Sequence, residues 1–187
     1  MTGTAIALLA ALAVFPVALH PLTRLHRVIP LTVAAGSTLA MLGVAAVLGA
    51  TAGPATGVGL HVAQCAAVVA AVTGGGTVVR SLLLLGGVDP WTSDANPDGV
   101  SYDGAGDDDV ETPLRGGRII GFLERAGVAV TLVVGWPEGL AIILAVKGLA
   151  RYPELREAHA GEQFIIGTFG SVLYAVATAG AAYLIAH

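Results

Sequence analysis

Three charged residues lie at matched distances from a predicted turn in the second half of the chain. Arg125 stands 11 residues before Trp136, Lys147 stands 11 residues after it, and Glu124 precedes Arg125. In two antiparallel helices joined at this turn, a rise of about 1.5 Å per residue places Arg125 and Lys147 at one depth, about 16 Å from the turn. Charges within hydrocarbon require partners. We therefore expect Glu124 to pair with Lys147 or with Arg151, which shares a helix face with Lys147.

A second matched pair lies farther from the turn. Arg118 and Glu154 each stand 18 residues from Trp136, and we expect Glu154 to pair with Arg118 or Arg125. Tyr152 is a further hydrogen-bond donor nearby. The complete predicted cluster consists of Arg118, Glu124, Arg125, Lys147, Arg151, Glu154, Glu162 and Thr168. Its basic residues outnumber its acidic residues, so it carries a surplus of positive charge.

This surplus has three chemical interpretations. The cluster binds an anion such as a lipid phosphate, with the first amides of the last helix as further donors. Alternatively, its ion pairs only lock three helices together, or Glu124 belongs to a proton or ion relay. We expect an integral membrane protein that binds or moves a small anionic solute or an anionic lipid. The alternatives are an enzyme acting on a phospholipid or polyprenyl phosphate, with Glu124 or Glu162 as base, and a structural subunit of a membrane complex.

The elements that position the cluster are predicted from composition and apolar runs. Of 187 residues, 55% are hydrophobic and 12% are charged, whereas soluble domains carry about 25% charged residues. A soluble fold is therefore excluded, and runs of about 17 to 25 apolar residues predict transmembrane helices. We predict an all-α transmembrane fold of one domain, 1–187, in which a hairpin of the fourth and fifth helices packs on the sixth. The six helices are expected at 3–19, 28–50, 57–85, 119–134, 139–150 and 164–186.

The basic residues predict the orientation in the membrane. All nine Lys and Arg residues fall on one side of the six-helix arrangement, and cytoplasmic connections carry an excess of such residues. Both termini are therefore expected on the non-cytoplasmic side of the cell membrane. A hairpin that spans the bilayer and one that only dips into it keep the same sides, so charge leaves both open. The single lysine and the many Ala and Gly residues indicate a prokaryotic source.

An acidic segment, 86–117, is expected to be a flexible cytoplasmic loop. Eight of the 13 acidic residues lie between 89 and 111, among Pro, Gly and Asn residues that cannot build a core. Asp94, Asn96 and Asp98 match the first half of a calcium-binding loop. The second half fails because Ala105 stands where a bidentate Glu is required, so this is a weak metal candidate.

Small residues predict close helix packing at two places. Gly167, Ser171, Ala175 and Ala179 recur at a spacing of four, which fits packing within one chain or against a second copy. The run 74–76 is three glycines inside an apolar helix and lacks the Lys-Ser of a phosphate-binding loop, so a kink or close packing is expected.

The sequence does not predict nucleic-acid binding, a cofactor, a histidine metal site or a disulfide. No dense basic surface predicts nucleic-acid binding, no motif predicts a cofactor, and the histidines lack the spacing of metal ligands. The single cysteine, Cys65, excludes an intrachain disulfide. The expected partners are the lipid bilayer, an anionic lipid or solute, and either a second copy or another membrane subunit.

The charged residues of the second half also form a pattern that resembles one found in a family of membrane proteins. The pattern Gly-x-Ile-Gly-x-Leu-Glu-Arg, then Lys-Gly-x-x-Arg-x-x-Glu-Leu, then Ile-Gly-Thr-x-x-Ser resembles the carboxy-terminal module of an uncharacterised family of small prokaryotic multi-pass membrane proteins. The matching stretches here lie within 117–125, 145–155 and 162–171, and the first of them has one more Ile than the pattern. The resemblance covers about the last third of the chain and implies no activity. It implies that the charged residues and Thr168 act as a unit.

Overall fold

A computed structural model describes residues 1–19, 28–87, 117–150, 152 and 158–187. These residues form six α-helices and no strand. The helices are α1 (Thr2–Ala18), α3 (Val28–Thr51), α4 (Val58–Leu85), α5 (Gly117–Val133), α6 (Glu138–Ala150) and α7 (Ala158–Ala186). Within these described residues, the expectation of an all-helical fold with six helices is confirmed.

The helix ends follow the apolar runs closely, with one exception. The first five helices begin and end within two residues of their expected bounds, but α7 begins at Ala158, six residues before Phe164. The expected start was wrong because it followed hydropathy alone. The added residues include Ala158, Glu162 and Gln163, which are good helix formers whatever their polarity.

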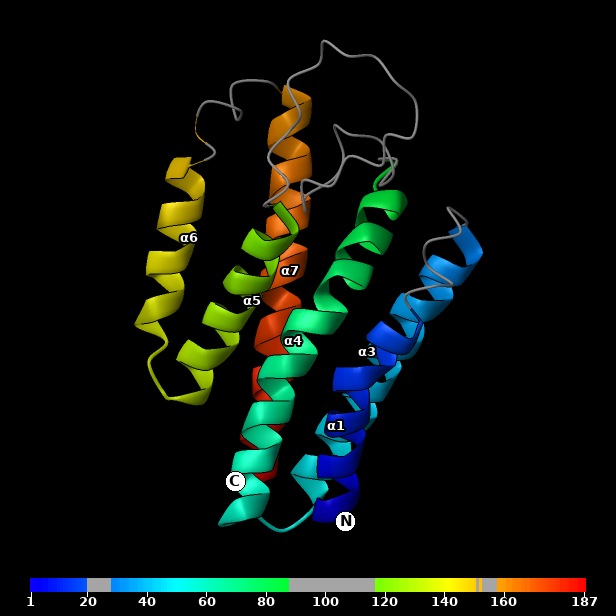
Figure 1. Ribbon diagram of the computed structural model, residues 1–187, viewed down its shortest axis with the longest axis vertical. Coiled ribbons are helices and arrows are strands. Elements are labelled where there is room, and N and C mark those ends of the chain that lie inside the picture. Colours follow the sequence, from blue (N-terminus) through cyan, green and yellow to red (C-terminus); the bar gives the residue numbers. More distant parts are fainter. Residues whose placement is uncertain (20–27, 88–116, 151, 153–157) are drawn as a thin grey trace.

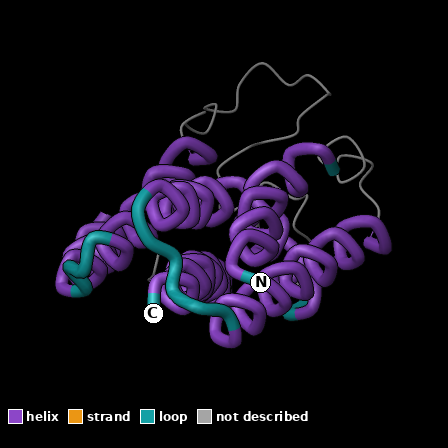
Figure 2. Tube along the Cα trace, turned by 90° about the horizontal axis from the view of Figure 1, so that it is seen from below, coloured by secondary structure: helices purple, strands orange, loops and turns teal. Residues whose placement is uncertain are grey.

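Four helices form the body of the molecule, and two are added to one side of it. In the body, α4 contacts α1, α3 and α7, while α3 contacts α1 and α7. The pair α5 and α6 stands beside this body (Figure 1), where α5 contacts α4 and α7 and α6 packs against α5. Seen along the helices, the α5–α6 hairpin lies at one edge of the molecule (Figure 2).

The body is packed through small side chains. Its core contains mostly alanines from α1, α4 and α7, together with a few leucines such as Leu9 and Leu12. A Cβ on Gly49 would lie 2.8 Å from the side chain of Ile185, so α3 and α7 approach closely there. The four residues of the predicted small-residue stripe are buried: Gly167, Ser171, Ala175 and Ala179. The stripe therefore packs within one chain and does not present itself to a partner subunit.

Both termini lie at one end of the molecule, at the turn between α3 and α4 (Figure 1). Thr2 Oγ1 donates a hydrogen bond of 2.8 Å to the carbonyl of Gly53, and the amide of Ala55 donates one of 2.8 Å to the carbonyl of Ile185. The other ends of α4, α5 and α7 point the opposite way. The end that holds the termini and the α3–α4 turn therefore lies opposite the last residues of α4 and the first residues of α5 and α7.

Three described helices are long and apolar enough to cross a membrane: α3, α4 and the part of α7 from Gly161 to Ala186. The helix α1 is apolar but has 17 residues, and α5 and α6 have 17 and 13. Large apolar side chains point outward along the spans, including Val33, Val47 and Phe169, each more than 60% exposed. Soluble monomers rarely carry so much exposed apolar surface. Such a surface suits contact with lipid chains.

Candidate functional site

The turn between α5 and α6 brings the two charged stretches together. Gly135 has a φ of 78°, a left-handed conformation that favours glycine. The amide of Trp136 then donates a hydrogen bond of 2.7 Å to the carbonyl of Thr131. A Cβ on Gly139 would lie 2.5 Å from Thr131 and 3.0 Å from the Trp136 ring, so α6 can begin this close only with glycine there. This tight turn fixes α6 antiparallel to α5.

Glu124 and Lys147 meet across the hairpin. Lys147 Nζ donates a hydrogen bond to Glu124 Oε2, forming an ion pair whose two side chains are each about one-fifth exposed. This is one of the two pairings that the spacing predicts. The ammonium group also lies 5.9 Å from the ring centroid of Phe164 on α7, within range of a cation–π interaction. Lys147 therefore links α6 to α5 and faces α7.

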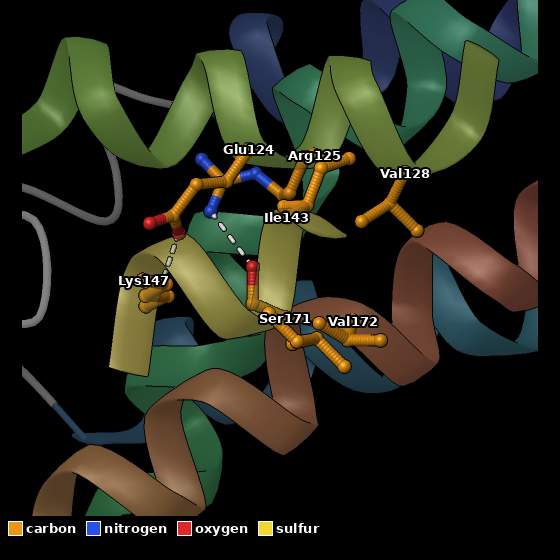
Figure 3. A pocket seen from close by; sticks show the side chains of 8 residues that line it. Glu124, Arg125, Val128, Ile143, Lys147, Ser171 and Val172 are labelled. Atoms are coloured by element: carbon orange, nitrogen blue, oxygen red, sulfur yellow. Dashed lines mark hydrogen bonds and ion pairs between the residues drawn. The ribbon is translucent and has the colours of Figure 1, made fainter. Parts of the chain in front are cut away.

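Among the cluster residues whose side chains are described, Arg125 is the most deeply buried, with 2% of its surface exposed. Its Nη1 donates a hydrogen bond of 3.3 Å to Ser171 Oγ on α7, and its guanidinium lies 5.4 Å from the Phe122 ring. Arg125 thus joins α5 to α7 while Glu124, its neighbour in sequence, joins α5 to α6 (Figure 3). Two adjacent residues of one helix hold both partner helices.

Two glycines of α4 make room for the buried polar side chains. A Cβ on Gly75 would lie 2.3 Å from Arg125 Cδ, and a Cβ on Gly74 would lie 2.1 Å from the hydroxyl of Tyr174. No larger residue fits at either place without movement. The glycine run is therefore a close-packing site, one of the two roles that its sequence predicts. It forms a notch in α4 that receives Arg125 from α5 and Tyr174 from α7.

A small recess with about 10 Å³ of enclosed space, room for about one water molecule, lies beside the ion pair. It lies between α5, α6 and α7, and Figure 3 shows the polar groups of Glu124, Arg125, Lys147 and Ser171 directed toward one region. Four apolar residues complete its lining: Val128, Ile143, Leu144 and Val172. Among the described residues, the lining has two basic side chains and one acidic side chain.

The structure places the remaining predicted residues differently. Thr168 is buried in α7 but does not line the recess, and Glu162 is exposed near the start of α7. Arg151 and Glu154 lie outside the described residues, as does the side chain of Arg118. The weak calcium candidate formed by Asp94, Asn96 and Asp98 also lies outside them.

Three residues that pack at the charged cluster were not predicted from the sequence to belong to it: Ser171, Gly75 and Tyr174. The sequence assigns Ser171 to the small-residue stripe and to the resemblance pattern, and it predicts a kink or close packing at Gly75. It predicts no role for Tyr174. Tyr174 is 3% exposed, and its hydroxyl has no hydrogen-bond partner among the described residues. Helical spacing could have linked two of these residues. Ser171 and Tyr174 are three residues apart on α7, and such residues share a helix face.

The side chains beside the recess are of types that can recognise anions, and in the structure Lys147 is engaged by Glu124 and Arg125 by Ser171. Guanidinium and ammonium groups donate charge-assisted hydrogen bonds to phosphate or carboxylate oxygens, and the Ser171 hydroxyl adds a neutral donor. Glu124 is engaged by Lys147, so using it as a base would first require breaking that ion pair.

Comparison of the chain with protein-family models, curated proteins and solved structures finds no match. The resemblance of the carboxy-terminal third to an uncharacterised membrane family therefore stays a prediction that rests on its residues.

Proposed function

We propose that this chain is a multi-pass membrane protein that binds an anion in the recess between α5, α6 and α7. The supporting observation is the lining itself, in which Arg125, Lys147 and Ser171 offer donors and Glu124 is the single acid. Ionisable groups placed among membrane helices are costly, which makes them functional candidates. The shared chemistry of the proposed ligands is a phosphate oxyanion, carried by a free anion or by a lipid headgroup.

The proposal includes the hairpin as a packed unit. The α5–α6 hairpin rests on α7 through the Arg125–Ser171 hydrogen bond and through Lys147 beside Phe164. At about 1.5 Å per residue, α6 is about 20 Å long, less than the roughly 30 Å of a hydrocarbon core. In Figure 1 the hairpin turn stops short of the end where the termini lie. These observations favour a hairpin that enters the membrane without crossing it.

The orientation is also proposed: the end with the termini faces away from the cytosol. Its support is the absence of Lys and Arg from the stretch between α3 and α4 and from the two ends of the chain. In a Cys65→Ala background, cysteines at Thr56 and Ser101 label from opposite sides of sealed vesicles. Labelling of both from one side would overturn the orientation.

The anion site is tested by binding to the full-length protein in neutral detergent after lipid removal. Inorganic phosphate and a short-chain phosphatidic acid are titrated separately, and thermal unfolding reports binding because a ligand of the folded state raises Tm. We expect at least one probe to raise Tm saturably in the wild type, and Lys147→Met to abolish the rise.

The matched control is Arg80→Met. Arg80 is a partly buried arginine of α4 whose Nε donates a hydrogen bond to the carbonyl of Gly76 in its own helix, and it does not line the recess. We expect this variant to bind like the wild type. Binding of neither probe, or binding that survives Lys147→Met, would refute the anion site.

A further inference from the structure

Tyr174 is a buried polar residue that the proposed anion site does not use. Its side chain belongs to α7, only 3% of its surface is exposed, and its hydroxyl has no hydrogen-bond partner among the described residues. Buried polar groups of native proteins nearly always have a partner, because leaving one unpaired costs free energy. A second arrangement of the neighbouring side chains, in which this hydroxyl is paired, is therefore expected.

A cation lies beside this hydroxyl in the notch of α4. A Cβ on Gly74 would lie 2.1 Å from the Tyr174 hydroxyl. A Cβ on the next residue, Gly75, would lie 2.8 Å from Arg125 Nε. The positive charge of Arg125 acts on the hydroxyl, although no hydrogen bond joins the two groups in this structure. The notch thus brings a guanidinium next to a hydroxyl that lacks a partner in the described part of the chain.

Ser171 and Tyr174 offer this guanidinium two acceptors on one face of α7. They are three residues apart, so they share that face and are separated by about 4.5 Å along the helix axis. Arg125 Nη1 donates to Ser171 Oγ at 3.3 Å (Figure 3), which is longer than the usual length of about 2.9–3.0 Å. A guanidinium carries several N–H donors. Rotation of the Arg125 side chain can therefore aim an N–H at either acceptor.

We propose that Arg125 alternates between two hydrogen-bond partners, Ser171 in this structure and Tyr174 in a second state. In the second state a guanidinium N–H donates to Tyr174 Oη, and the Ser171 hydroxyl donates to a carbonyl of the preceding turn of its own helix, as serines within helices do. The glycines of the notch place no Cβ between the two side-chain ends. The exchange therefore needs rotation of side chains and no movement of α4.

This switch goes beyond the proposed function, because it needs no bound anion. It concerns the packing of α5 on α4 and α7, and its test contains no ligand. Arg125 and Ser171 both line the recess, so the two states present different donors there. If the anion site is refuted, the switch still stands on the buried hydroxyl and its neighbouring cation.

The direct test is ¹⁹F NMR of the full-length protein in detergent, with 3-fluorotyrosine at its 4 tyrosines. The Tyr174 signal is assigned by its loss in Tyr174→Phe. We expect Ser171→Ala to shift this signal, because the guanidinium then stays on the hydroxyl. We expect Arg125→Met to shift it in the opposite direction, because the donor is gone.

The matched control is Tyr183, an exposed tyrosine of the same helix, whose signal is expected to stay in place in both variants. A Tyr174 signal that ignores Ser171→Ala would overturn the switch. So would a signal that moves in the same direction in both variants, since loss of the first partner and loss of the donor would then be equivalent.

Thermal unfolding tests the same switch if Arg125→Met does not fold. Ser171→Ala and Tyr174→Phe each leave one of the two acceptors, so we expect small changes in Tm. The double variant removes both acceptors and is expected to lower Tm by more than the sum of the single changes. Ser171→Ala combined with Tyr183→Phe is the control pair and is expected to be additive. Additive changes in the Tyr174 pair would overturn the proposal.

Discussion

The four-helix body and the α5–α6 hairpin bury different kinds of side chain. The body buries small apolar residues, whereas the hairpin buries or half-buries charged ones. The helices α1 and α3 carry no charged residue, and they pack on α4 and α7 through alanine, glycine and leucine. In the hairpin, two short helices carry Glu124, Arg125 and Lys147 toward a shared recess. Small residues pack the body, whereas charged side chains join the hairpin helices to each other and to α7.

The two regions meet at the notch in α4. Gly74 and Gly75 belong to the body, but the side chains that fill their missing Cβ positions are Tyr174 of α7 and Arg125 of α5. Glycine inside a helix costs about 1 kcal/mol relative to alanine in water. The space it provides lets a guanidinium lie deep between helices and still reach Ser171. The small-residue packing of the body is therefore also what positions the charge of the hairpin.

The largest expected effect comes from filling the notch. Gly74→Ala places a methyl group 2.1 Å from the present position of the Tyr174 hydroxyl, at the far end of a rigid ring. We expect a loss of about 1–3 kcal/mol in the free energy of unfolding, measured by denaturation in detergent. Gly43→Ala, at an open position of α3, is the control and is expected to change little. Equal losses at both glycines would show that the notch has no special role.

The next effect comes from breaking the ion pair from one side. Lys147→Ala leaves Glu124 without its ammonium partner in a partly buried place, and we expect a loss of about 2 kcal/mol, less than for a fully buried pair. The double variant Glu124→Ala/Lys147→Ala should lose less than Lys147→Ala alone, because no charge is stranded. Thermal melts of both proteins in one detergent make the comparison. Additive losses would mean that the two residues do not depend on each other.

The smallest effect separates local from interhelical hydrogen bonds in the body. Thr73 Oγ1 donates to the carbonyl of Ala13 on α1 at 2.9 Å, whereas Thr32 Oγ1 donates only to carbonyls of its own helix. We expect Thr73→Val to cost about 0.6 kcal/mol and Thr32→Val to cost nothing measurable, by the same denaturation assay. A larger cost at Thr32 would contradict the view that helix packing decides the stability of the body.

The six helices and the Glu124–Lys147 ion pair could be predicted from the sequence. The contacts of Arg125 with Gly75 and Ser171 could not, because they depend on how distant helices pack. Apolar runs located six helices, since hydropathy and helix length are local properties. The equal spacing of Arg125 and Lys147 from Trp136 anticipated that α5 and α6 would bring Glu124 to Lys147. Gly75 and Ser171 became neighbours of Arg125 only through the packing of α4 and α7 on α5. Nothing in their local sequence specifies that approach.

The central claim, that the hairpin charges bind an anion and do not merely lock helices, is tested most directly by two variants of one contact. Glu124→Gln and Lys147→Met both break the same ion pair, and the measurement is the affinity for short-chain phosphatidic acid. An anion site predicts opposite changes: at least about threefold tighter binding when the acid is removed, and loss of binding when the base is removed. A purely structural pair predicts that both variants shift binding and stability in the same direction, and that result would contradict the account.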